Sequence, residues 1–330
     1  MTINEIAEKA GVSIGTVDRV IHNRGRVSPE TISKVKKIIE DSGFTPNPLA
    51  RQLALNKPVR IGVLLPKLKS DSAYWNLIYS GIQKAIDELK LLAMEVCLIE
   101  FARDKKGDFL LKAKETEKAD FQALIIAPIM ADEVKESLHL FSNIPYVFVD
   151  SPLPGSQALS TVAQNPYSGG LCAGRMMKLL SPAAKKIFCI QMHSGTYNLN
   201  ERAKGFSDFY NDKKIINITE NFSNHKSAET FIKEILSQKP DGIFLPDNSS
   251  YMFARYCKEN HIEKNFSLVG YDLMKENKKF LKEGFIDCLL SQGAEEQGYE
   301  AVKSIYQKII NGNVIKSISM PITIYFKENI

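Results

Sequence analysis

Short apolar runs rich in Val and Ile alternate with longer helical patterns over most of this chain, and this alternation restricts the fold more than any other feature. The runs form two series, one over residues 59–66, 94–100, 122–128 and 144–150, and one over residues 185–192, 241–247, 266–272 and 286–292. Strands separated by helices form βαβ units with parallel sheets. Two such series in about 270 residues predict an α/β domain with two lobes.

Composition is that of a globular protein. Hydrophobic residues make up 44% of the chain, and no run reaches the roughly 18 apolar residues of a membrane span. The chain begins directly with a helical pattern and has no signal-peptide pattern, so we expect a cytoplasmic protein. No C-x-x-C pair is present, and we expect buried, reduced thiols at Cys97, Cys172, Cys189, Cys257 and Cys288.

The first 45 residues have a different pattern, which predicts three short helices. Thr2 and Glu5 have the spacing of a capping box, Ser13 is a good cap for a second helix, and Ser28 before Pro29 opens a third. The predicted apolar stripes are Ile6, Ala7 and Ala10, then Val17, Val20 and Ile21, and finally Ile32, Val35, Ile38 and Ile39. A glycine-containing turn between the first two helices gives the helix-turn-helix arrangement.

The outward face of the second helix carries groups that can contact DNA. Thr16 and Arg19 can donate to phosphates or to base edges. The first 60 residues contain ten Lys or Arg and six Asp or Glu, so +4 of the formal net charge of +5 lies there, as expected for a protein that binds a polyanion. The alternative is a small helical bundle in which Arg19 is a solvated surface charge.

The segment that follows, "GFTPNPLARQLALNK" (residues 43–57), has the pattern of a short helix. Asn47 can cap it and Pro48 can occupy its first position. Such a helix is marginal in water, and Leu53 has no obvious core to fill, so it is a candidate for a wedge in the minor groove. The alternative is an ordinary linker with a few buried leucines.

The stretch "TINEIAEKAGVSIGTVDRVIHNRGRVSPET" followed by "GFTPNPLARQLA" resembles the LacI/GalR family of bacterial transcription regulators. The resemblance implies that the start of the second helix reads the major groove and that Leu53 enters the minor groove beside Ala50. Ile14, Gly15 and Asp18 depart from the residues that many members carry, so known operators do not transfer. The expected DNA contacts are Thr2, Ser13, Ile14, Gly15, Thr16, Arg19, His22, Asn23, Arg26, Asn47, Ala50 and Leu53.

Polar residues at the carboxyl ends of the predicted strands are candidates for a ligand site, because ligands of open α/β sheets bind there. Carboxylates, amides, one arginine and flat aromatic rings suit a polyhydroxylated ligand. For any one of these residues alone, a helix cap or a turn is the alternative. The candidates are Asp71, Tyr74, Trp75, Asp150, His193, Arg202, Asp247, Asn248, Asp272 and Gln292.

This part of the chain resembles the periplasmic-binding-protein fold that the family uses to sense small molecules. The resemblance matches the family's effector contacts to Asp150, Arg202, Asp247, Asp272 and Gln292, and also to Asn165. The resemblance implies a sugar or a related metabolite as effector, although some members of the family sense purines. The aspartates at the strand ends and Arg202 suit a neutral sugar or a sugar acid best. The implied domains are a head at 1–46, a hinge at 47–58 and an effector domain at 59–330, with lobes of about 60–160 plus 292–325 and about 161–291.

Two other classes of protein use the same kind of α/β fold. A solute-binding protein shares the two α/β halves but requires export, which the basic helical head argues against. An enzyme would need a nucleophile and a base, and this sequence shows no such pair. It also shows neither a nucleotide-binding motif nor a metal-ligand spacing, so we expect no cofactor. We therefore predict a homodimeric regulator of a pseudo-palindromic operator.

Overall fold

The computed structural model describes residues 3–21, 25, 27–42, 58–68, 73–89, 94–192, 196–211, 215–219, 225–311 and 317–330. The chain divides into two compact units, Met1–Lys57 and Pro58–Ile330. We call the first unit the head and the second the core domain, and each is described by itself.

The head contains the three predicted helices, α1 (Ile3–Ala10), α2 (Ile14–Ile21) and α3 (Pro29–Ser42). The Ser13 hydroxyl accepts a hydrogen bond from the Thr16 amide at 3.2 Å, and Ser28 caps α3 in the same way. Gly11 ends α1 with a φ of +65°, a conformation that costs glycine little. The head core consists of Ile6, Ala7, Ala10, Val17, Val20 and Val35, with Ile21, Ile32, Ile38 and Ile39 partly buried against it.

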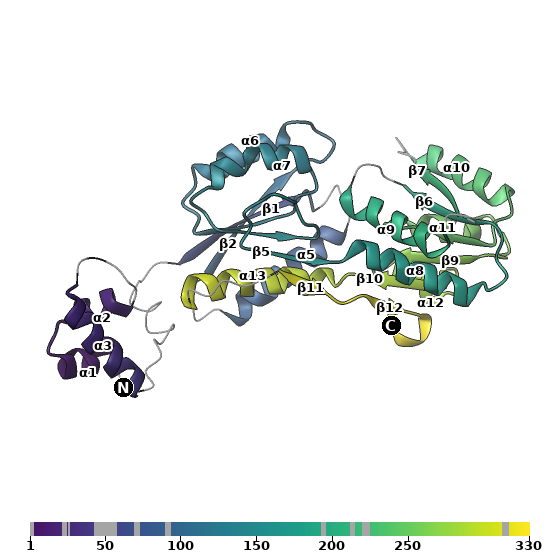
Figure 1. The fold of residues 1–330 in the computed structure, drawn as a ribbon. Coiled ribbons are helices and arrows are strands. Elements are labelled where there is room, and N and C mark those ends of the chain that lie inside the picture. The colour runs from purple at the N-terminus through teal and green to yellow at the C-terminus, as the bar shows by residue number, and fades with distance from the viewer. Residues whose placement is uncertain are drawn as a thin grey trace. The chain divides into compact units, whose positions relative to one another are not determined.

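Two sheets, each with six strands among the described residues, form the core domain (Figure 1). All described strand pairs are parallel except β10 with β12, so the predicted parallel α/β architecture is confirmed. In spatial order, the first sheet contains β11 (Ile318–Met320), β5 (Ser160–Gln164), β4 (Tyr146–Val149), β3 (Ala123–Ile126), β1 (Val59–Pro66) and β2 (Met94–Phe101). The second contains β12 (Thr323–Tyr325), β10 (Cys288–Ser291), β9 (Ser267–Tyr271), β8 (Gly242–Phe244), β6 (Ile187–Gln191) and β7 (Ile215–Thr219).

Helices pack on both sheets, which is why the central strands are apolar on both faces. In β1, for example, Ile61, Val63 and Leu65 belong to one buried cluster and Leu64 belongs to another. The first sheet carries α5 (Ala73–Glu88), α6 (Asp108–Glu117), α7 (Ala131–Ser137), the short 3₁₀ helix η2 (Leu138–Phe141) and α13 (Ala294–Asn311). The second carries α8 (Pro166–Leu180), α9 (Tyr197–Phe209), α10 (His225–Ser237), α11 (Ser250–Glu259) and α12 (Lys275–Lys282), and η3 (Lys327–Asn329) follows β12.

Each sheet with its helices forms one lobe, and the chain crosses between the lobes after β5, after β10 and after β11. Two expected lobe boundaries are corrected. The first lobe continues beyond residue 160, because β5 pairs with β4 up to Val162 and with β11 up to Gln164. The last crossing comes before residue 325, because β12 pairs with β10 in the second sheet.

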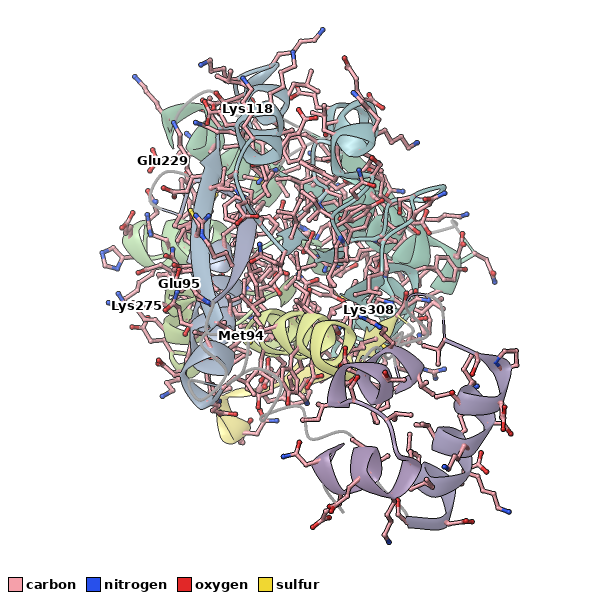
Figure 2. The ribbon with its side chains drawn as sticks, turned by 90° about the vertical axis from the view of Figure 1, so that its left-hand side faces the viewer. Met94, Glu95, Lys118, Glu229, Lys275 and Lys308 are labelled. Atoms are coloured by element: carbon pink, nitrogen blue, oxygen red, sulfur yellow. The ribbon has the colours of Figure 1, made fainter. Side chains whose placement is uncertain are left out.

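The strand β2 lies at the edge of the first sheet, where Figure 2 labels Met94 and Glu95. Glu95 and Glu100 are exposed on it, and charges on an edge strand oppose pairing with another chain.

Cys97 is exposed on this strand and Cys172 is half-buried, so the expectation of buried thiols is correct only for Cys189, Cys257 and Cys288. Among the described residues, no helix is long and apolar enough to cross a membrane.

Candidate functional site

The exposed face of α2 in the head combines an apolar and a cationic side chain. Ile14 is 52% exposed, Ser13, Gly15 and Arg19 are also exposed, and Thr16 is half-buried with its hydroxyl 2.9 Å from that of Ser13. An aliphatic side chain suits a thymine methyl group and a guanidinium suits guanine. The other expected DNA contacts, Thr2, His22, Asn23, Arg26, Asn47, Ala50 and Leu53, lie outside the described residues.

In the core domain, a buried aspartate joins the two lobes. The Tyr74 hydroxyl donates to Asp150 Oδ1 at 2.8 Å. The Asn198 amide donates to the Asp150 carbonyl at 2.9 Å and to Oδ2 at 3.1 Å. Tyr74 and Asp150 belong to the first lobe and Asn198 belongs to the second, so these two hydrogen bonds of Asn198 connect the lobes.

Arg202 lies one helical turn after Asn198 on α9 and is only 2% exposed. Its guanidinium carbon lies 3.8 Å from the centre of the Tyr271 ring, and its Nη1 donates to the Pro246 carbonyl at 2.9 Å. Its Nε and Nη2 have no hydrogen-bond partner among the described residues. A buried guanidinium with two unsatisfied donors is well placed to bind an oxygen-rich molecule.

Two more aspartates complete the site from the second lobe. Gln292 Nε2 donates to Asp272 Oδ2 at 3.3 Å. Asp247 accepts from the Met192 and Ser249 amides at 3.0 and 2.9 Å, which orders the turn after β8. We use the name buried polar cluster for Tyr74, Asp150, Asn198, Arg202, Asp247, Asp272 and Gln292, all of which are less than 9% exposed.

The backbone at two of these aspartates is in a conformation that side chains rarely adopt. Asp150 has a φ of +73° and Asp272 has a φ of +63°. Each follows the third strand of its sheet, β4 in the first and β9 in the second. Left-handed conformations of residues other than glycine are costly and concentrate at functional sites.

The electrostatics of the buried polar cluster follow from burial. Burial raises the pKa of Asp150, against the opposing effect of Arg202, and raises that of Asp272 to about 6. Burial opposes the positive charge of Arg202, but Tyr271 and the two carboxylates outweigh it and raise its pKa. The cluster therefore holds one permanent buried cation among three aspartates.

Unsatisfied buried atoms of both hydrogen-bonding kinds occur in the buried polar cluster and on neighbouring residues. Besides the two Arg202 donors, the atoms without a partner among the described residues include the side-chain oxygens of Gln191, Asn198 and Gln292 and the indole nitrogen of Trp75. Buried polar groups are normally hydrogen-bonded, so a concentration of unpaired ones points to a bound polar molecule. A molecule that pairs with both kinds of atom both donates and accepts hydrogen bonds.

Three predicted ligand residues are not members of the buried polar cluster, and each makes another contact. Asn165 is exposed and caps α8, its side chain accepting from the Ser168 amide at 3.0 Å. Asn248 is half-buried, and its carbonyl accepts from Asn277. Trp75 packs edge-on against Tyr74, with ring centres 5.0 Å apart. Asp71 and His193 lie outside the described residues.

Three further residues of the site were not predicted from the sequence, namely Asn198, Gln191 and Tyr271. Asn198 had a signal that was available, because it precedes Arg202 by four residues and therefore lies on the same helix face. Gln191 is a polar residue at the end of β6, so its position also offered a signal. Tyr271 is an aromatic residue at the end of an apolar strand, a pattern that indicates a core residue. Only the packing of Arg202 on its ring reveals its part in the site.

Comparison with known proteins agrees with both units. Residues 61–313 match the periplasmic binding protein domain family, and residues 2–47 match the family of bacterial regulatory proteins, lacI family. The sucrose operon repressor of Lactococcus lactis subsp. lactis is 25% identical over 98% of both chains. The transcriptional repressor PurR of Vibrio atlanticus is 22% identical over 96% of this chain and 99% of that one.

Among solved structures, the Lac repressor bound to ONPG has a TM-score of 0.68 at 19% identity and covers 98% of both chains, which shows a common fold. The two matched families together cover most of the head and nearly all of the core domain. The chain therefore belongs to the lacI family of bacterial regulatory proteins, and it is a DNA-binding transcriptional regulator with a periplasmic-binding-protein-like domain.

Proposed function

We propose that this protein is a cytoplasmic repressor that binds a pseudo-palindromic operator as a homodimer. Two copies related by two-fold symmetry present two heads, so the operator is expected to contain two half-sites related by the same symmetry. Arg19 and Ile14 on the exposed face of α2 contact bases in the major groove, and Leu53 enters the minor groove at the centre. The repressor names of the relatives and the residues exposed on α2 support this proposal.

The effector of this repressor is a neutral sugar, bound at the buried polar cluster. The observation that carries this assignment is the set of unpaired buried donors and acceptors in the buried polar cluster, on Arg202, Asn198 and Gln292. Each hydroxyl of a sugar both donates and accepts, so a sugar offers partners of the right kind to the Arg202 donors and to the oxygens of Gln191 and Gln292. Carboxylates accept from further hydroxyls.

Charge favours a neutral sugar over a sugar acid or a sugar phosphate. Three aspartates and one arginine are buried in the cluster, and the half-buried Arg103 also lowers the pKa of Asp150. The carboxylates therefore outnumber the cations even when Arg103 is included. An added anion would be repelled at short range in a medium of low dielectric constant.

Thermal unfolding of the full chain against sugars, sugar acids, sugar phosphates and purines tests the effector class. A neutral sugar at 100 times its Kd is expected to stabilise the protein by about 2.7 kcal/mol. The Asn165→Ala variant, which alters an exposed cap, should keep this response. A response to purines alone would replace the sugar assignment, and stabilisation by anions alone would contradict the charge argument.

Replacing Arg19 by alanine is expected to weaken operator binding by about 1–3 kcal/mol and to relax preference at one base position. The reason is that a guanidinium pairs with one guanine edge. The operator is first selected from random DNA with the full chain, and binding is then measured to single-base variants of it. The Lys36→Ala variant removes an exposed charge from α3 and serves as the control. An equal loss on every sequence would mean that Arg19 contacts only phosphate.

A further inference from the structure

One side chain contacts all three connections between the lobes. Gln164 is the last residue of β5, immediately before the first crossing, and is 3% exposed. Its amide nitrogen donates to the Ser291 carbonyl at 2.9 Å, at the second crossing, and to the Pro321 carbonyl at 3.1 Å, at the third. Both N–H groups of this carboxamide are therefore used to hold the crossings together.

The oxygen of the same carboxamide is bound from the second lobe. The Tyr271 hydroxyl donates to Gln164 Oε1 at 2.6 Å, and both groups are buried. Tyr271 ends β9, and its ring supports the Arg202 guanidinium at 3.8 Å. A continuous series of contacts thus runs from Arg202 through Tyr271 to Gln164 and the three crossings.

Close packing around the Tyr271 hydroxyl requires glycine in the first turn of α8. A Cβ on Gly169 would lie 2.1 Å from the Tyr271 oxygen and 3.1 Å from Gln164 Oε1. Alanine at this position would displace the hydroxyl, since neither the buried ring nor the helix has room to give. Gly169 therefore permits the hydrogen bond between Tyr271 and Gln164.

We propose that Gln164 is a positioning residue that sets the relative orientation of the two lobes, and that Tyr271 links it to Arg202. The hydrogen bond between Tyr271 and Gln164 joins the second lobe to the first, so its loss favours other lobe orientations. The link from Arg202 to an effector rests on the function proposed above. The link from Tyr271 to lobe orientation does not, and it is tested without effector or DNA.

The single tryptophan of the chain reports on lobe orientation. Trp75 is 3% exposed and belongs to a buried cluster that includes Met274, which follows β9 in the second lobe. Separation of the lobes removes Met274 from this cluster. Quenching of Trp75 fluorescence by acrylamide, measured on the full chain without ligand, therefore increases when the lobes separate.

The variant Tyr271→Phe keeps the ring beneath Arg202 and removes only the hydroxyl. We expect its Stern–Volmer constant for acrylamide to rise at least about threefold, because an unpaired buried acceptor shifts such an equilibrium strongly. Gly169→Ala should act in the same direction. The control is Tyr146→Phe, which removes a buried hydroxyl that accepts from the Gln157 amide within the first lobe.

Combining two variants shows whether Gln164 and Tyr271 act through one bond. If they do, Gln164→Ala with Tyr271→Phe increases quenching no further than Gln164→Ala alone. Similar melting temperatures of Tyr271→Phe and Tyr146→Phe, with increased quenching only in the first, support the proposal. Equal quenching of these two variants, or additive effects in the double variant, would overturn it, and neither result bears on whether a sugar binds.

Discussion

The Arg202→Ala variant is expected to lose about 3–5 kcal/mol of folding free energy at pH 7.5 and to lose the thermal response to any effector. Arg202 is 2% exposed and is the permanent cation among Asp150, Asp247 and Asp272. Removing one partner of a buried charge cluster leaves uncompensated charges, which is the costly case. The two unpaired donors that a ligand would use disappear with it.

This loss should depend on pH with a known sign. Arg202 lowers the pKa of both Asp150 and Asp272, so its removal raises both pKa values further. A carboxylate whose pKa is raised in the folded state destabilises the fold at pH values above that pKa. This free-energy cost disappears at low pH, where the group is protonated in both the folded and the unfolded state. Urea unfolding of the variant at pH 5 and pH 7.5 should therefore show that much of the stability returns at pH 5.

The Arg202→Lys variant separates charge from shape. It keeps a cation in the cluster and should retain most of the stability, but a lysine lacks the planar fork that stacks on Tyr271 and pairs with two oxygens. Effector binding should still fail. Operator binding without effector should survive in both variants under conditions where they fold, because the head is a separate compact unit. Its loss in a folded variant would show that Arg202 is also needed for DNA binding.

The Asp272→Asn variant is expected to be more stable than the wild type at pH 8, in contrast to Arg202→Ala. Burial raises the pKa of Asp272 from 3.8 to about 6, so the folded state holds this proton more tightly than the unfolded state. Stability therefore falls as pH rises from about 4 to about 6 and stays lower above that range. At about 1.4 kcal/mol for each tenfold change in proton affinity, the cost is about 3 kcal/mol.

Replacing the carboxylate by an amide removes this cost and flattens the pH dependence between pH 4 and pH 7. It should also weaken sugar binding, since one acceptor oxygen is lost. Such a gain in stability with a loss of binding is the usual conflict between stability and function at a strained site. Asp241→Asn is the matched control with opposite sign. Backbone hydrogen bonds from Lys185 and Lys186 lower the pKa of Asp241, so this variant should lose stability above about pH 4. A lower stability of Asp272→Asn at pH 8 would contradict the assigned pKa.

The order of strands and helices, the head and several site residues could be predicted because each depends on local pattern. Ser13 and Ser28 cap helices with their own side chains, and β1 is apolar on both faces because helices cover both. Asp150, Asp272 and Gln292 were found because the carboxyl ends of parallel strands meet at one edge of a sheet. Asn165 also follows a strand, but its side chain caps a helix. Position in the chain alone could not distinguish a helix cap from a ligand-binding residue.

Pattern and spacing in the sequence determined the α/β class, the helix-turn-helix head and the set of strand-end candidates, since these follow from periodicity and from capping within a few residues. Tertiary structure alone decided the contacts that join distant segments. Gln164 reaches Ser291 and Pro321, Asn198 reaches Asp150, and Arg202 stacks on Tyr271. The physical reason is that these contacts, and the burial that raises the Asp272 pKa, depend on how two lobes pack across three crossings, which no local pattern encodes.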